Sequence, residues 1–165
     1  MIEHLQTLIH ALREELQQYG EMLALLDHQQ ELVVARAAED LFQSISAIQN
    51  QANVIQRARA VRDEHRQSVA GALVQPADTA FTVLIPLLPA DYQPLVQALV
   101  LENNQLLFRV QQRARQNHLL LSRSLELMQR FMSTLFPSRE TLVYNDQGNR
   151  QIFSLPARPL YEAIG

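Results

Sequence analysis

The sequence has 165 residues, a length that fits one domain, and 47% of them are hydrophobic, which is enough to build a core. It contains no cysteine, and this excludes disulfides, thiolate metal sites and a cysteine nucleophile. The net charge of −3 argues against a nucleic-acid-binding domain, which is usually strongly basic. With only 4 glycines and many helix-forming residues, the composition predicts an all-α protein.

Residues 1–35 carry the clearest helical pattern. Apolar residues recur there at alternating spacings of three and four, which is the a/d seam of a helix that packs against another helix. These seam residues are Ile2, Leu5, Ile9, Leu12, Leu16, Tyr19, Leu23 and Leu26. The opposite face is polar, so we expect one narrow stripe of this helix to be buried.

A second helix is predicted over residues 38–70, with Leu41, Ile45 and Ile55 on its apolar stripe. Neither Gly nor Pro marks its start. We nevertheless place a turn near residues 36–38, because the chain must fold back to bury its stripes. Gly71 is the expected C-terminal cap. Arginines 57, 59, 62 and 66 are expected to form a solvated face that pairs with the acidic first helix.

Four prolines interrupt the helical pattern between residues 72 and 94. A short helix is expected over 78–88, capped by Asp78, and Asp91 can cap the next helix. The prediction is therefore an antiparallel helical bundle over residues 1–136, with three long helices and one short helix.

The last helix is predicted over residues 92–136, and its seam includes polar residues. Asn103, Asn117 and Ser124 occupy seam positions, where they either fix the register against a partner helix or lie exposed. Near its end the helix is apolar over more than one stripe, with Leu119, Leu127 and Phe131 among the residues involved. Either the rest of the chain covers this surface, or it receives an amphipathic partner helix.

Residues 137–165 differ in character from the helices. Residues 141–144 and 150–153 flank a turn sequence that ends in Gly148, which predicts a β-hairpin or an extended tail. An isolated two-stranded hairpin is marginally stable in water. We therefore interpret this segment as a partner-binding tail that is docked or becomes ordered on binding.

No motif in the sequence predicts catalysis. No two of the five histidines have the i, i+4 spacing of a helical zinc pair, and there is no Glu-x-x-His motif or nucleophile elbow. We therefore expect no catalytic residues, no metal, no cofactor and no small-molecule substrate. The N-terminal residues lack the basic-then-apolar order of a signal peptide, and the apolar run 81–90 is too short to span a bilayer, so we expect a cytoplasmic protein.

Two C-terminal stretches resemble the FlgN family of flagellar export chaperones. Residues 115–125, RQNHLLLSRSL, resemble the asparagine-containing stretch in the long last helix of that family, and residues 141–148, TLVYNDQG, resemble its tyrosine–turn–glycine motif. Residues 32–41 resemble its first helix–helix connection. Two positions depart from the family pattern: His118 follows the motif asparagine where glycine is common, and Ala38-Glu39-Asp40 replaces a common Gly-Asp.

The resemblance implies a chaperone without enzymatic activity. Its clients would be hook-associated proteins of the hook–filament junction, held as monomers through their C-terminal helical segments and delivered to the type III export gate. Tyr144 would dock on the cytoplasmic domain of that gate, so contact with the membrane would be indirect. The residues assigned to client binding are Asn117, Leu120, Leu121, Leu125, Met128, Met132 and Leu135.

A different class of protein fits the same heptads. A structural coiled-coil protein that self-associates through the long helix has the same pattern, although that interpretation gives Tyr144 and its turn no role. Nucleic acid is not an expected partner in either case.

Overall fold

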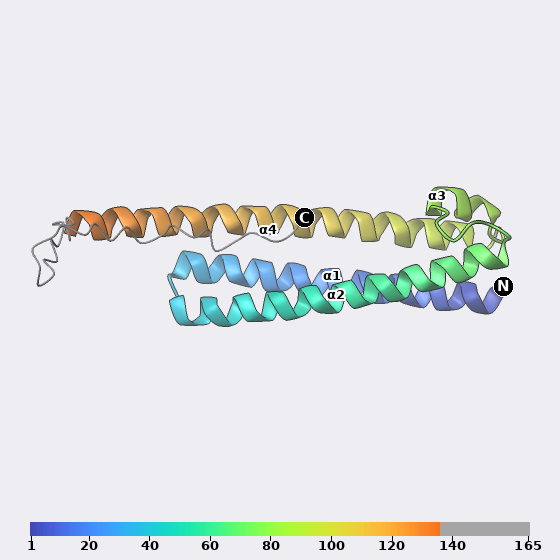
Figure 1. The fold of residues 1–165 in the computed structure, drawn as a ribbon, viewed down its shortest axis with the longest axis horizontal. Helices are drawn as coiled ribbons and strands as arrows, with labels where there is room; N and C mark the ends of the chain where they lie inside the picture. The colour runs from blue at the N-terminus through green and yellow to red at the C-terminus, as the bar shows by residue number, and fades with distance from the viewer. Residues whose placement is uncertain (136–165) are drawn as a thin grey trace, which may run out of the picture. The chain divides into compact units, whose positions relative to one another are not determined.

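The computed structural model describes residues 1–135, without the side chains of Met132, Ser133 and Leu135. Its elements are α1 (Ile2–Ala35), α2 (Ala38–Ala72), α3 (Phe81–Leu84), the 3-10 turn η1 (Ile85–Leu87) and α4 (Gln93–Leu135) (Figure 1). The predicted all-α class is confirmed for this part of the chain, which has no strand. The hairpin predicted between residues 141 and 153 lies outside the described residues.

Backbone contacts divide the chain into two units, Met1–Ser124 and Leu125–Gly165, and the boundary falls within α4. The first unit contains α1, α2, α3, η1 and the larger part of α4. All packing contacts described below belong to it. The helical bundle predicted over residues 1–136 includes residues on both sides of this boundary, and that domain division stays a prediction.

The turn between α1 and α2 is closed by the backbone alone. Arg36 adopts the left-handed conformation, with φ 57°. The N–H of Ala37 donates to the carbonyl of Leu32 at 3.1 Å, and that of Arg36 donates to Val33 at 3.3 Å. These two bonds satisfy the last carbonyls of α1, as in a Schellman motif. The turn is thus possible without the Gly or Pro that would have marked it in the sequence.

The expected cap at Gly71 is wrong, because α2 continues through this residue to Ala72. The left-handed residue is instead Val74, with φ 57°. Its N–H donates to Gly71 at 3.0 Å, and the N–H of Gln75 donates to Ala70 at 2.9 Å. A β-branched residue is unusual in this conformation, since its Cβ substituents crowd the backbone.

The short helix is also shorter than expected. It begins at Phe81 after Ala80, and no side chain caps it, so the predicted cap at Asp78 is wrong. The first helical N–H groups, those of Val83 and Leu84, donate to the carbonyl of Ala80. Asp78 lies two residues before Ala80, within the preceding turn.

Helix α1 is buried on two sides. The predicted seam is buried at Leu5, Leu12 and Tyr19. A second seam beside it is buried as well, and consists of Leu8, Ala11, Glu15, Gln18, Met22 and Gln29. Two seams are needed because α1 packs against α2 on one side and α4 on the other, as the contacts below show.

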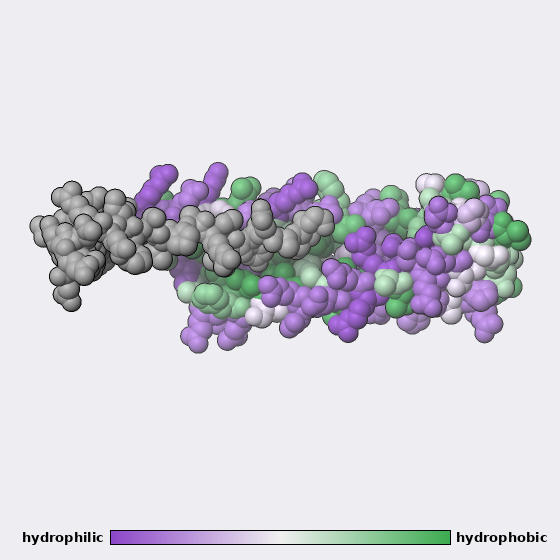
Figure 2. All heavy atoms as spheres, viewed as in Figure 1, coloured by the Kyte–Doolittle hydropathy of each residue, from purple (hydrophilic) through white to green (hydrophobic). Residues whose placement is uncertain are grey.

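Two apolar clusters hold the three long helices together. One joins Leu5, Leu8 and Leu12 of α1 to Val69 of α2 and Val96 of α4. The other surrounds Tyr19, Met22 and Leu26 and includes Ile55 of α2, with Val110 of α4 packed against it. On the face seen in Figure 2, hydrophilic side chains predominate over α1 and α2, and hydrophobic ones gather around α3.

Candidate functional site

The residues assigned to client binding all lie on α4, and they differ in exposure. Asn117 is 1% exposed, whereas Leu120 and Leu121 are half-buried. Leu125 and Met128 are exposed at 60% and 64%. The side chains of Met132 and Leu135 lie outside the described residues, and so does the whole of Tyr144.

Asn117 lies inside the contact between α4 and α1. Its Nδ2 donates to the backbone carbonyl of Leu26 at 2.7 Å and to Oε1 of Gln29 at 3.1 Å. Its Oδ1 is buried and has no hydrogen-bond partner among residues 1–135. Gln29 is itself only 6% exposed, so this polar pair is sealed between the two helices. Asn117 therefore helps to fix the register of α4 against α1 and is not part of the exposed surface of α4.

Arg113 adds a second polar contact one turn before Asn117. Its Nε pairs with Oδ1 of Asp27 at 2.6 Å, and its Nη1 donates to Oε1 of Gln30 at 2.6 Å. The α1–α4 contact thus combines apolar side chains, such as Leu12 and Val96, with the polar contacts made by Asn117 and Arg113. Polar contacts define the position of one helix on another more strictly than apolar ones, because each donor needs its acceptor.

Beyond Asn117, several large apolar side chains of α4 are exposed. Leu119, Leu125 and Leu127 are 60%, 60% and 66% exposed, and Phe131 is 63% exposed. Large apolar side chains exposed together on one helix are typical of a binding surface. The sequence left open whether the rest of the chain covers this region; within residues 1–135 these side chains are exposed, and their role in binding stays a prediction.

The model of the FlgN protein family matches residues 1–152. The chain belongs to the FlgN family. FlgN proteins are flagellar export chaperones, not enzymes. Neither the curated proteins nor the solved structures contain a match.

The FlgN match spans every described helix and also residues 141–148, which carry the tyrosine–turn–glycine sequence. It therefore covers both the exposed end of α4 and Tyr144. Within residues 1–135 of this FlgN chain, no group of three or more His, Cys, Asp or Glu side chains has the arrangement of a metal site. None of the helices described is long and apolar enough to cross a bilayer.

One buried polar network of the FlgN chain was not predicted in detail. Glu15 is 2% exposed on the side of α1 that faces α2; its Oε1 accepts a hydrogen bond from the Tyr19 hydroxyl at 2.8 Å. Its Oε2 pairs with Nη1 of Arg62 at 3.4 Å. Burial, together with the bond to Glu15, raises the pKa of Tyr19 above its usual range, so its phenol stays protonated.

The arginines of α2 divide into two kinds. Arg62 pairs with Glu15 of α1. Arg66 makes two contacts: its Nε donates to Oδ1 of Asp63 at 3.0 Å, and its Nη1 donates to the carbonyl of Thr79 at 2.5 Å. The hydrogen bond from Arg66 holds the pKa of Asp63 below its usual value. Arg57 and Arg59 are exposed. The expected pairing with the acidic helix is therefore made by Arg62, and Arg66 ties α2 to the segment before α3.

Proposed function

We propose that the chain is a cytoplasmic export chaperone that binds the C-terminal helical segments of hook–filament junction proteins. The observation that carries this proposal is the exposed apolar end of α4, represented by Leu125 and Met128 at 60% and 64% exposure. A client helix laid along this surface stays monomeric, because the apolar face through which it would polymerise is covered. Membership of a chaperone family supports the same role.

The free energy gained by burying these side chains is compatible with reversible client binding. Fully burying one leucine or methionine side chain contributes about 1.5–3 kcal/mol, so a few of them are enough for binding that a competitor can reverse. Methionines also repack around different partners, which suits a surface with more than one client. In this proposal Leu120, Leu121, Leu125, Met128, Met132 and Leu135 contact the client, and Asn117 positions the helix that carries them.

Delivery is the second part of the proposal. Tyr144 docks on the cytoplasmic domain of the export gate, and the client leaves when the gate competes for it. No nucleotide or other cofactor is needed for such an exchange. Support comes from the tyrosine–turn–glycine sequence at residues 141–148, which lies inside the family match.

The test is a calorimetric titration of the full chain with the C-terminal segment of a junction protein from the same genome. The binding variant is Leu125→Ser with Met128→Ser. The matched control is Leu101→Ser with Phe108→Ser, which removes side chains of 58% and 66% exposure elsewhere on α4. We expect one-to-one binding that weakens at least tenfold in the first variant and is unchanged in the control.

A chain ending at Pro137 separates the contributions of the helix and the tail. Binding that survives this truncation places the client on α4, and binding lost on truncation assigns it to residues 138–165. If neither form binds the segment, the chaperone proposal fails. A stable oligomer whose interface buries residues 117–135, measured by light scattering, would then favour the self-associating coiled coil.

A further inference from the structure

The exposed apolar side chains of α4 lie on two different faces of the helix. Successive residues of an α-helix are rotated by about 100°, so each position can be compared with Asn117, which contacts α1. Met128 and Phe131 lie within about 40° of Asn117 on this scale, whereas Leu119 and Phe108 lie about 160–180° away. All four side chains are 60–66% exposed. Exposure by itself therefore does not distinguish the two faces.

The face centred on Asn117 is the one that packs against α1 in the bundle. Val96 lies within about 60° of it and is buried in the first apolar cluster. Asn103 lies on this face as well, and both asparagines donate to backbone carbonyls of α1 that lie 91 positions earlier in the chain. By this offset Ala35, the last residue of α1, corresponds to Glu126 of α4. Residues of this face after Glu126 therefore have no counterpart on α1.

The same face of α4 carries no charge between residues 120 and 135. Its described apolar residues there are Leu120, Leu121, Leu125, Leu127, Met128 and Phe131. Ser124, a polar residue among them, donates its Oγ to the carbonyl of Leu120 at 2.9 Å, so its hydroxyl is satisfied within the helix. Arg123, Glu126 and Arg130 all lie about 120° or more from Asn117, on the opposite half. This face can thus be buried without removing a charge from water.

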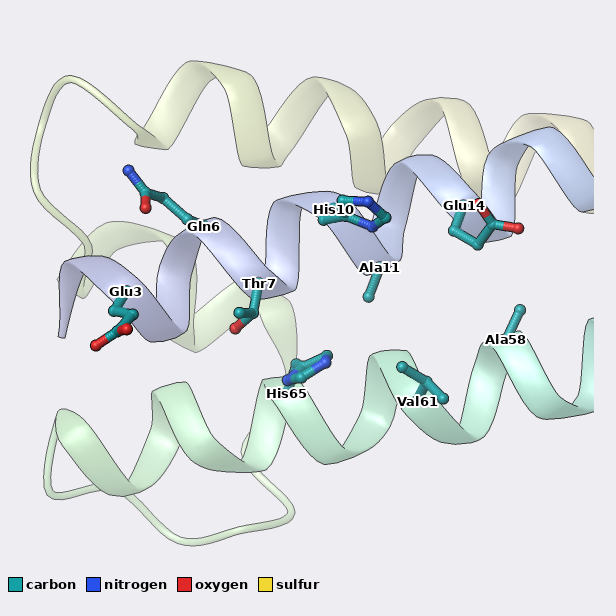
Figure 3. Close-up of a pocket in the computed structure, with 9 residues that line it drawn as sticks. All are labelled: Glu3, Gln6, Thr7, His10, Ala11, Glu14, Ala58, Val61 and His65. Carbon is teal, nitrogen blue, oxygen red and sulfur yellow. The ribbon is translucent and has the colours of Figure 1, made fainter.

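A groove elsewhere on the bundle provides a contrast. Figure 3 shows this groove between α1 and α2, where Glu3, Glu14 and two histidines line the same space as Val61. Ala11, its apolar residue on α1, is only 5% exposed. A helix buried there would remove carboxylates from water, which costs free energy unless each of them is paired. The face of α4 that follows α1 is free of this cost.

We propose that the client helix occupies, along the last turns of α4, the place that α1 occupies earlier on the same face. This binding mode rests on the proposed function and adds to it the face and the contacts. Phe131 and Leu127, which are not among the residues assigned to client binding from the sequence, join Met128 in the contact, and Leu119 stays outside it. Continuity with the α1–α4 interface supports this occupant, because the spacing of side chains that packs one helix is presented unchanged to the next.

The client segment that fits this face has a defined pattern. The stretch of α4 from residue 120 to residue 135 extends about 24 Å, or about four turns. A helix of similar length packs along it when its aliphatic residues recur at alternating spacings of three and four. Because α4 offers no charge on this face, the contacting side of the client should carry none either.

Single cysteines locate the client directly, because the chain contains no cysteine of its own. In the full chain, Phe131→Cys places a thiol on the face that follows α1, and Leu119→Cys places one on the opposite face, at positions of 63% and 60% exposure. The measurement is the rate of maleimide labelling with and without a saturating, cysteine-free C-terminal segment of a junction protein. We expect the segment to slow labelling at least tenfold at position 131 and less than twofold at position 119. Equal protection at both positions, or protection at neither, would overturn this binding mode.

Affinity provides an independent measurement. Phe131→Ser and Leu119→Ser each remove one exposed apolar side chain, so both variants should keep the melting temperature of the unmodified chain. In calorimetric titration with the same segment, we expect an affinity loss of about tenfold or more for Phe131→Ser and of less than about twofold for Leu119→Ser. Equal losses would overturn the binding mode and leave the proposed function standing. If the unmodified chain does not bind the segment, the proposed function itself fails, so the two failures are distinguishable.

Discussion

Asn103 and Asn117 repeat one contact two heptads apart on α4: each donates its Nδ2 to the backbone carbonyl of the α1 residue that lies 91 positions earlier in the chain. The carbonyls belong to Leu12 and Leu26, and the distances are 2.9 and 2.7 Å. Because both contacts have the same offset, α1 and α4 run parallel and in a single register. A shift of either helix by one turn would break both bonds.

The two asparagines should nevertheless differ in their contribution to stability. Asn103→Leu removes the side-chain donor from two main-chain carbonyls, those of Leu12 and Leu99. Both carbonyls still accept backbone hydrogen bonds within their own helices. Asn117→Leu also leaves the buried Oε1 of Gln29 unpaired, and an unpaired buried polar atom costs about 1–3 kcal/mol. We expect the Asn117 variant to be less stable than the Asn103 variant by about 1 kcal/mol in urea unfolding. Equal stabilities would show that Gln29 finds another donor.

Arg62→Ala should destabilise the fold more than any other arginine variant of α2. It leaves the carboxylate of Glu15 buried without its cation, and breaking a buried pair in this way costs about 3 kcal/mol. Arg59→Ala is the control; Arg59 is exposed, so we expect a change within about 0.5 kcal/mol. Thermal unfolding at pH 7 measures both. The additional change Glu15→Gln should restore part of the loss.

The pair of Asp63 and Arg66 gives a pH-dependent contribution to stability. Because the folded-state pKa of Asp63 lies below its ordinary value of 3.8, its carboxylate stabilises the fold above that pH, and this contribution is lost as pH falls through the folded-state pKa. Asp63 is half exposed, so we expect Asp63→Asn to cost at most about 1 kcal/mol at pH 7. The difference from the unmodified chain should shrink below pH 3.8. A difference independent of pH would assign the effect to packing.

Val74→Gly should stabilise the chain. Val74 has a φ of 57°, where glycine has no steric cost, and its side chain is 91% exposed, so little burial is lost. We expect a gain of about 1 kcal/mol, seen as a higher melting temperature. Val34→Gly is the control, since Val34 is 75% exposed inside α1, where glycine should destabilise.

Tyr144→Ala should leave the melting temperature unchanged and reduce motility, if Tyr144 contacts the export gate. The matched control is Tyr161→Ala, a tyrosine of the same tail that lies outside the family match at residues 1–152. Motility in soft agar and secretion of junction proteins into the medium are the measurements. Normal motility of the Tyr144 variant would contradict the docking role.

Much of the helical architecture could be read from periodicity. The seam from Leu5 to Leu26 predicted the buried stripe of α1, and the need to fold back placed the turn that the structure shows at Arg36. What periodicity missed is the second seam of α1. Glu15, Gln18 and Gln29 are polar, so their positions look solvated in the sequence, and only their partners on α2 and α4 explain their burial.

The helix ends were less predictable, because backbone hydrogen bonds close them. Gly71 and Asp78 are residue types that commonly cap helices. In the structure, however, Val74 is the left-handed residue after α2, and Ala80 is the N-cap of α3. At the candidate site, the apolar end of α4 is visible in the sequence as a pattern, and its role in binding stays a prediction. It left open whether Asn117 was buried or exposed, since one helix by itself does not show which side its neighbour covers.

The parallel pairing of α1 with α4 has a consequence for synthesis on the ribosome. The hydrogen bond between Gln51 and Gln18 joins residues 33 positions apart, so the α1–α2 hairpin can form early in synthesis. The hydrogen bond between Asn103 and the carbonyl of Leu12 joins residues 91 positions apart and can form only later. At about 5–20 residues per second, translation from position 51 to position 103 takes about 3–10 s. During that interval the nascent hairpin carries the bare α4-facing stripe of α1, so this chaperone passes through a stage in which its own apolar surface needs protection.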